Sequence, residues 1–384
     1  MIIIFNWIRT NLLASKLDVL LSLLGAYFIY LVTSIFLTFV FTSDWTLIEV
    51  NRKILLLGLF PDDQIWRIWV LFAMSSILIS ATLSYSYRFN IKTAIFYVLL
   101  VLTTFLIFTT LKLLPIILSI LGFALLVYLL VLRFKFVYKK LIFRIVLIGW
   151  VIFIPTMFLI LLLGGGPKVT LWGGFFVNLI LAVIAILAGF PLGVLFALGR
   201  ASSLQTVKLV SVVFIETFRG APLIAWLFFA WFVLPDFLPN IFSLNEANLV
   251  IRAMIVLSLF SSAYIAEVIR GGLQSIPRGQ LEASRALGLN TFSELSFIIL
   301  PQAIRVVIPA IVSTFIAVFK DTSLVFILGI TDLLRIGRLI PEQQQEFYGK
   351  SIEVLLVVAL LFWVVSLILS QISLSIEKRL NVSN

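Results

Sequence analysis

Long apolar segments, separated by short polar loops, follow one another along the whole chain. Segments near or above 18 residues are long enough to cross the hydrocarbon core of a membrane as helices. Continuous apolar segments also favour helices over barrel strands, in which apolar and polar residues alternate. The pattern predicts an all-α polytopic membrane protein with about ten transmembrane helices, at 19–42, 66–87, 93–111, 114–132, 145–163, 172–198, 209–234, 249–270, 302–328 and 352–375.

The third and fourth predicted spans, 93–111 and 114–132, are separated only by a short segment that contains Lys112 and Pro115. This pair has two interpretations. It is either a tight hairpin of two spans or a single span with a re-entrant or interfacial segment. The choice matters because one span fewer would place the two ends of the chain on opposite sides of the membrane.

Composition excludes several classes of protein. The chain is 62% hydrophobic and 12% charged, which is more apolar surface than a soluble domain needs. It contains no Cys and no His, so it has neither a disulfide framework nor a Cys-based metal site, and it lacks the commonest metal ligand and general base. The sequence also lacks a P-loop pattern, a catalytic triad and a metal-binding cluster. We therefore expect no catalytic residue, no metal site and no cofactor in this chain.

The basic residues predict the sidedness of the spans. The net charge is +11, and in a membrane protein such a balance is typical of cytoplasmic loops facing anionic lipid rather than of nucleic-acid binding. Most Lys and Arg residues, including those of the basic segment 133–144, are cytoplasmic when both termini are cytoplasmic. The GGGPK loop at 164–168 then lies outside. It divides the chain into an N-terminal transmembrane extension, 1–165, and a second region, 166–384, with five spans each.

A polar loop at 271–301 carries the pattern E-A-x(4)-L-G-x(9)-I-x-L-P. Pro277 suits the first turn of a helix, and Gly288 suits its C-terminal stop. Thr291 and Glu294 have capping-box spacing and predict a second helix, which Pro301 ends or kinks. The loop therefore predicts a short helix, a turn, and a second helix that runs into the next span. The pattern residues are Glu282, Ala283, Leu287, Gly288, Ile298, Leu300 and Pro301.

This loop resembles the EAA loop of permease subunits in ATP-driven (ABC-type) importers, where the cytosolic ATPase grips the membrane subunit. The segments 216–235, 263–289 and 319–333 resemble the polar amino-acid permease family, which includes histidine, glutamine and general L-amino-acid permeases. The resemblance covers about 170–376 and implies that the last five spans form a type I ABC importer permease core. The N-terminal half resembles, in length and hydropathy, the extension found in permeases of broad-range L-amino-acid importers.

The resemblance implies a function and a set of partners. The chain would be a multi-pass permease subunit in the cell (inner) membrane, forming half of the pathway of an amino-acid importer. Its partners would be a cytosolic ABC ATPase dimer that uses ATP and Mg, a second permease, an extracytoplasmic amino-acid-binding protein, the amino acid and membrane lipid. The broad-range resemblance favours a different homologous chain as the second permease. The residues implied to couple to the ATPase are Glu282, Ala283, Arg285, Leu287 and Gly288.

Two positions depart from the family pattern. Ser284 stands where the common EAA run has Ala, a small-for-small change that keeps ATPase docking plausible. Ala221 stands where the family often has Thr, and the change affects the polarity of the cavity or nothing at all.

Charged residues inside the C-terminal spans are candidates for the substrate pathway, because such charges are costly and usually face a cavity or a partner. Glu216 and Arg219 lie three residues apart, just before Pro222, which can open a local break in the helix. Two interpretations stay open. Glu216 lines the pathway and meets the substrate ammonium, or it pairs with Arg219 and braces the kink. Glu267 and Arg270 repeat the spacing near the cytoplasmic end, and we predict a structural or gate pair there.

A second polar cluster lies within the predicted span 302–328. It either breaks the helix and presents hydroxyls and a charge to the pathway, or forms a re-entrant bend that serves only the fold. Its members are Lys320, Asp321, Thr322 and Ser323.

A stand-alone secondary transporter or channel for small polar solutes is the alternative function. It would use the intramembrane charges for ion coupling, but it leaves the EAA-like loop unexplained. A membrane enzyme is a third class, and the lack of a catalytic constellation in the sequence argues against it.

Overall fold

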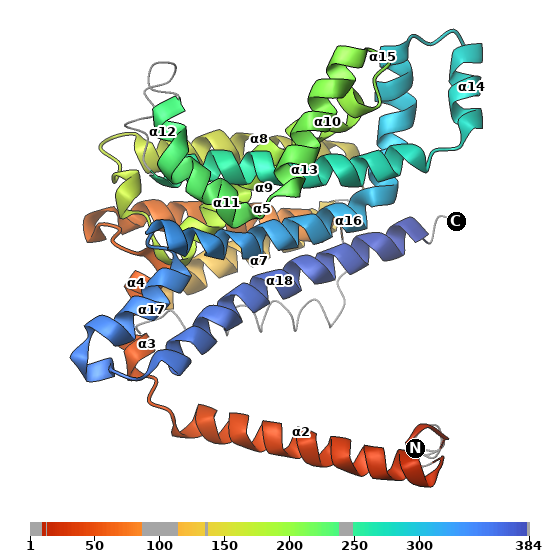
Figure 1. Cartoon of the computed structure of the whole chain (residues 1–384). Helices are drawn as coiled ribbons and strands as arrows, with labels where there is room; N and C mark the ends of the chain where they lie inside the picture. Colours follow the sequence, from red (N-terminus) through yellow and green to blue (C-terminus); the bar gives the residue numbers. More distant parts are fainter. Residues whose placement is uncertain (1–9, 13, 87–113, 135–136, 238–248, 382–384) are drawn as a thin grey trace. The chain divides into compact units, whose positions relative to one another are not determined.

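The computed structural model describes residues 10–12, 14–86, 114–134, 137–237 and 249–381 (Figure 1). Within these ranges the regular elements are helices, and one isolated parallel bridge joins Gly174 to Asp332. The all-α prediction is therefore confirmed. The chain divides into two units, Met1–Val50 and Asn51–Asn384, and each is described by itself. The division expected at 164–168 stays a prediction.

The first unit consists of the long helix α2 (Lys16–Thr42) and the short helix α3 (Thr46–Val50). Ser15 caps α2, because its hydroxyl accepts a hydrogen bond from the Asp18 backbone N–H at 3.1 Å. Helix α2 is apolar along its length and confirms the span predicted at 19–42.

The second unit begins with the elements that precede the GGGPK loop. They are α4 (Arg52–Leu57), η1 (Asp62–Gln64), α5 (Ile65–Ser86), α7 (Leu114–Phe134) and α8 (Lys139–Leu162). The spans predicted at 66–87, 114–132 and 145–163 are confirmed by α5, α7 and α8. The span predicted at 93–111 lies outside the described residues.

The side chain of Arg67, on α5, caps the C-terminal end of α8. This buried arginine was not singled out in the sequence. Its guanidinium donates to the carbonyl oxygens of Ile160, Leu163 (2.8 Å) and Gly164 (3.0 Å). The last carbonyls of a helix have no partner within the helix, so a cation placed there satisfies them and opposes the helix dipole.

The remainder of the second unit contains the C-terminal spans. Its elements are η2 (Val169–Leu171), α9 (Gly174–Arg200), α10 (Gln205–Gly220), α11 (Leu223–Phe228), the π-helical η3 (Phe229–Val233), α12 (Leu234–Phe237), α13 (Leu249–Gln274), α14 (Arg278–Ala286), α15 (Thr291–Ser293), the π-helical η4 (Glu294–Ile299), α16 (Leu300–Asp321), η5 (Thr322–Leu328), α17 (Leu333–Gln343), η6 (Gln345–Phe347) and α18 (Ser351–Asn381). Figure 1 shows α14 at one end of this unit, between α13 and the helix that leads into α16.

Eight helices of the described residues are long and apolar enough to cross a membrane, or up to nine if a bent pair forms one span. The bent pair is α10 with α11 and η3, which turn by 103° between Gly220 and Leu223. The sequence predicted one span at 209–234 with a local break at Pro222, and the break is confirmed.

The span predicted at 302–328 is longer than expected. It runs from Thr291 to Leu328, so Pro301 does not end the helix, and the kink expected there stays a prediction. The π-helical turn η4 lies directly before Pro301. A proline lacks the N–H that an α-helical turn uses, and the irregular turn accommodates that loss without ending the helix.

The core of the second unit depends on close packing between α9 and α13. A Cβ atom added at Gly193 would lie 2.7 Å from Ile265 Cγ2, and one added at Gly189 would overlap the Ser261 hydroxyl. That hydroxyl donates to the Ala185 carbonyl at 2.7 Å, so the two helices are also joined by a buried hydrogen bond. Gly189 and Gly193 therefore allow the two helices to approach closely.

A group of buried polar side chains joins α9 to the end of α16 and to the start of α17. Asn178, Thr322 and Asp332 are all fully buried. The Asn178 amide donates to the Thr322 hydroxyl at 3.2 Å and to Asp332 Oδ2 at 3.3 Å, and its oxygen accepts from the Leu333 N–H at 3.0 Å. Asp332 caps α17, and its burial raises the pKa of its carboxyl group to about 6.

We expect Asn178→Leu to lower the thermal stability of the protein. The substitution would leave the Leu333 N–H buried without an acceptor, which costs about 1–3 kcal/mol. The measurement is the melting temperature of the purified protein in detergent. Leu195→Ala, on the exposed side of the same helix, is the control and should change the melting temperature little. Equal melting temperatures for Asn178→Leu and the unaltered chain would contradict the role of this buried group.

Candidate functional site

The 271–301 loop folds as the sequence predicts in its first half. Pro277 lies immediately before α14 in an extended conformation, and Gly288 follows the helix with φ +72°. The Gly288 N–H donates to the Arg285 carbonyl at 2.9 Å, and the Leu289 N–H donates to the Ser284 carbonyl at 3.2 Å. Gly288 therefore ends the helix in the left-handed conformation that glycine adopts most easily.

The second half of the loop differs from the prediction. Asn290, not Thr291, caps the second helix, because its side-chain oxygen accepts from the Ser293 N–H at 2.8 Å. Glu294 does not close a capping box. Instead it is buried, and its Oε2 accepts a hydrogen bond from the Ser284 hydroxyl at 2.9 Å and lies 3.3 Å from Arg285 Nε.

The contact between Ser284 and Glu294 fixes α14 against the turn that leads into α16. Ser284 is 1% exposed, so its hydroxyl lies inside the loop rather than on the surface offered to a partner. A buried carboxylate needs hydrogen-bond partners, and Ser284 and Arg285 provide them. The position that departs from the common EAA pattern is thus part of the internal support of the loop.

The residues expected to contact an ATPase lie on the exposed surface of this supported loop. Leu287 is 77% exposed and Phe292 is 75% exposed, so the loop presents two large apolar side chains at its surface. The expected coupling residues that are exposed are Glu282, Ala283, Arg285, Leu287 and Gly288. Phe292 was not singled out in the sequence, although it lies only four residues after Gly288.

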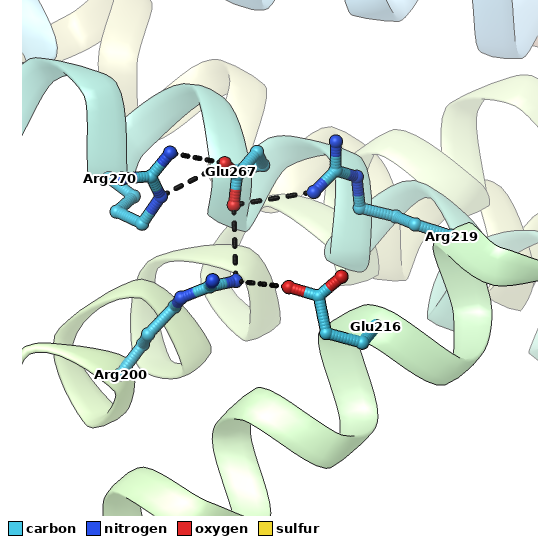
Figure 2. A network of polar contacts seen from close by, with 5 residues as sticks. All are labelled: Arg200, Glu216, Arg219, Glu267 and Arg270. Carbon is cyan, nitrogen blue, oxygen red and sulfur yellow. Dashed lines mark hydrogen bonds and ion pairs between the residues drawn. The ribbon is translucent and has the colours of Figure 1, made fainter.

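The charges of α9, α10 and α13 form one network (Figure 2). Arg200 Nη1 lies 2.8 Å from Glu216 Oε1 and 3.3 Å from Glu267 Oε2. Arg219 Nη1 lies 3.4 Å from the same Glu267 oxygen, and Arg270 donates through Nε to Glu267 Oε1 at 2.9 Å and also through Nη2. Glu267 therefore binds three arginines, each from a different helix.

This network corrects one expectation and confirms another. Glu216 pairs with Arg200 on α9, and Arg219 pairs with Glu267 on α13, so the expected brace between Glu216 and Arg219 is replaced by two links to other helices. The pair between Glu267 and Arg270 is confirmed as a contact. Arg200 was not singled out in the sequence, because nothing in the local sequence indicates that the end of α9 contacts two glutamates.

The network lies at the end of the spans from which α14 extends. Arg200 is the last residue of α9, and Arg270 lies four residues before the end of α13, which leads directly to α14. Glu216, which pairs with Arg200, is therefore at this end of the unit. Its side chain is 54% exposed, and that of Glu267 is 22% exposed.

The cluster at 320–323 is divided between two environments. Thr322 is fully buried in the group with Asn178, which favours a structural role for this residue. Asp321 ends α16, and among the described residues its carboxylate forms no hydrogen bond or ion pair. Lys320 is exposed, and the Ser323 hydroxyl donates to the Lys320 carbonyl at 2.8 Å. The α-helix changes to a 3₁₀ helix at Thr322 within the continuous span Thr291–Leu328, so the break expected in this cluster stays a prediction.

No group of three or more Asp, Glu, His or Cys side chains able to hold a metal ion occurs in the part of the chain that the structure describes. The expectations of no metal site and no cofactor in this chain stay predictions.

The family described as "Binding-protein-dependent transport system inner membrane component" matches residues 189–382. The inner membrane amino-acid ABC transporter permease protein YhdY of Escherichia coli K12 is 40% identical over 238 residues, which are 61% of this chain and 64% of that protein. The glutamate/glutamine/aspartate/asparagine transport system permease protein BztC of Rhodobacter capsulatus is 44% identical over 209 residues, which are 54% of this chain and 48% of that protein. The matched part of this chain thus spans about half to two thirds of these two relatives.

A shorter relative is matched over nearly its whole length. The glutamate/aspartate import permease protein GltK of Escherichia coli O157:H7 is 34% identical over 208 residues, which are 54% of this chain and 91% of that protein. Among solved structures, the "Crystal structure of an amino acid ABC transporter with histidines" aligns with a TM-score of 0.46 and 32% identity, covering 54% of this chain and 92% of that one. The chain belongs to the family of inner membrane components of binding-protein-dependent transport systems.

Proposed function

We propose that this chain is the permease subunit of an ATP-driven amino-acid importer and forms half of its translocation pathway. The observation that supports this most directly is α14, a short helix held outside the spans by Ser284 and Glu294 and exposing Leu287. A rigid helix can transmit a displacement from a bound ATPase to the spans, whereas a flexible loop cannot. Family membership and the printed names of the relatives support the same function.

The proposal includes the partners. A cytosolic ATPase dimer would hydrolyse ATP with Mg, a second and different permease chain would complete the pathway, and an extracytoplasmic binding protein would deliver the amino acid. Both ends of α14 continue into long helices, α13 and the helix that becomes α16, so a displacement of α14 would act on two spans. A stand-alone secondary transporter leaves this supported, exposed helix without a purpose.

Isolation of the tagged chain from its native membrane tests the proposal. We expect an ABC ATPase and a second permease to be isolated with it, and we expect amino-acid uptake by the reconstituted assembly to require ATP. Uptake by the chain alone, driven by an ion gradient and without ATP, would instead support the secondary transporter.

Gly288→Ala should weaken coupling to the ATPase. Alanine at φ +72° costs about 1 kcal/mol, which predicts roughly fivefold lower uptake per hydrolysed ATP. Gly279→Ala is a matched control, because an added Cβ meets nothing within 4 Å at either glycine but only Gly288 has a positive φ. Normal coupling in Gly288→Ala would remove this turn from the proposed contact.

Asp321 is the better supported candidate for the substrate pathway. An amino acid carries an ammonium group, and a carboxylate without a partner inside a span is expensive unless a ligand or water compensates it. Glu216, by contrast, is already paired with Arg200. The proposed pathway residues are Lys320, Asp321 and Ser323; Glu216, Arg219 and Thr322 have structural partners.

We expect Asp321→Asn to lower uptake at least tenfold while the yield of folded protein stays the same. Glu216→Gln should instead reduce the yield of folded protein, because it weakens a link between α9 and α10. Uptake and fluorescence-detected size-exclusion profiles, measured side by side, distinguish the two effects. If the two variants show the opposite pattern, Glu216 and not Asp321 belongs to the pathway.

The sidedness of the membrane spans follows from the same proposal. Tags at residues 2 and 384 should both be accessible from the cytoplasm, and a Cys introduced at Lys168 should react with a membrane-impermeant reagent from outside. Tags on opposite sides would show that the number of spans is odd.

A further inference from the structure

A cationic pocket lies beside the charge network and takes no part in the function proposed above. It has a volume of about 390 Å³ and opens between the turn that joins α9 to α10 and the last turns of α13. Its charged lining consists of Arg200, Lys208 and Arg270, and no carboxylate contributes to the lining. The remaining lining residues are Ala201, Val212, Leu273 and Gln274.

The charges around this pocket do not balance. Glu216 and Glu267 supply two negative charges, whereas Arg200, Arg219, Arg270 and Lys208 supply four positive charges, so the group carries a net charge of plus two. Lys208 is exposed, and its ammonium group forms no hydrogen bond or ion pair with the described residues. An excess of positive charge at the end of membrane spans is favourable only beside an anion or in water.

The glutamates also hold two of the cations in place. Arg200 is bound by both Glu216 and Glu267, and Arg270 is bound twice by Glu267. Guanidinium groups that are fixed by other carboxylates lose little conformational entropy when they bind a further anion, and a guanidinium suits the oxygens of a phosphate.

The helix that carries Lys208, α10, also exposes apolar side chains at and near its start. Leu204 and Leu209 are 66% and 64% exposed, and Val210 and Val213 are more than half exposed. A ligand that fits both surfaces has an anionic head and an apolar body. The position of the pocket along the spans agrees with such a ligand. Arg200 ends α9 and Lys208 lies in the first turn of α10, and the ends of membrane helices lie near the lipid headgroups.

We propose that this pocket binds the phosphate of an anionic phospholipid, with its acyl chains along the exposed face of α10. The assignment of this lipid to the cytoplasmic leaflet rests on the proposed function, because that function places α14, and with it this end of the spans, on the cytoplasmic side. The binding itself does not rest on it. Lys208 supplies the free charge, and Arg200 and Arg270 supply donors that are already oriented.

Native mass spectrometry of the full-length chain in its native assembly, titrated with phosphatidylglycerol, tests the proposal without any transport assay. Lys208→Glu should raise the apparent Kd of the most tightly bound phosphatidylglycerol molecule about tenfold. The substitution replaces the unpaired positive charge of Lys208 with a negative charge. Lys208→Arg should keep the affinity within about twofold, since it preserves the charge. Lys140→Glu, an exposed basic residue outside the pocket, is the matched control and should have no effect on this lipid.

The outcomes separate the sources of the phosphate. Displacement of the lipid by excess phosphatidylcholine, or an equal loss in Lys208→Glu and Lys140→Glu, would overturn the proposal. Saturable binding of inorganic phosphate that depends on Lys208, with no preference for phosphatidylglycerol, would also overturn the proposal, because the ligand would then be a free anion. If the chain lacks ATPase coupling yet still loses phosphatidylglycerol on Lys208→Glu, only the proposed function fails.

Discussion

Compensation of charge at the ends of membrane helices is the constraint on which this structure depends. A charged side chain near the hydrocarbon core is costly unless an opposite charge or water reaches it. Glu267 meets this requirement for three arginines, and it does so from the helix that packs most closely on α9. Because the partners come from three helices, the same contacts that neutralise the charges also fix α9, α10 and α13 relative to one another.

The close approach of α9 and α13 makes this network possible. Gly189 and Gly193 leave no room for a larger side chain, so the two backbones lie near enough for Arg200 to reach Glu267. At the opposite end of α9, Asn178 satisfies the backbone of α17 and the Thr322 hydroxyl. Helix α9 is thus fixed by polar contacts at both ends and by small residues between them, as expected for helices that gain little from apolar contact in lipid.

The sequence predicted features that depend on neighbours along the chain. The lengths of apolar segments gave the spans, and Pro277 and Gly288 gave the bounds of α14, because helix ends are decided within a few residues. It did not predict the partners of Arg200, Asn178 and Glu294. Those contacts join residues that are distant along the chain or separated by a turn, and helical periodicity does not predict such contacts. Spacing suggested a pair between Glu216 and Arg219, but each pairs with a residue on another helix.

Helix α13 joins these separate features into one mechanical path. It carries Glu267 and Arg270 in the charge network, then Leu273 and Gln274 in the lining of the cationic pocket, and it leads to α14 at Arg278. After α14, the hydrogen bond between Ser284 and Glu294 joins this helix to the start of the span that contains α16. A displacement of α14 would therefore reach Arg270 within about two helical turns, before any other ion pair of the network. The ion pairs that stabilise the spans are therefore the first contacts that a displacement of α14 would disturb. A substitution in these ion pairs would change both the stability of this end of the spans and its response to a displacement of α14.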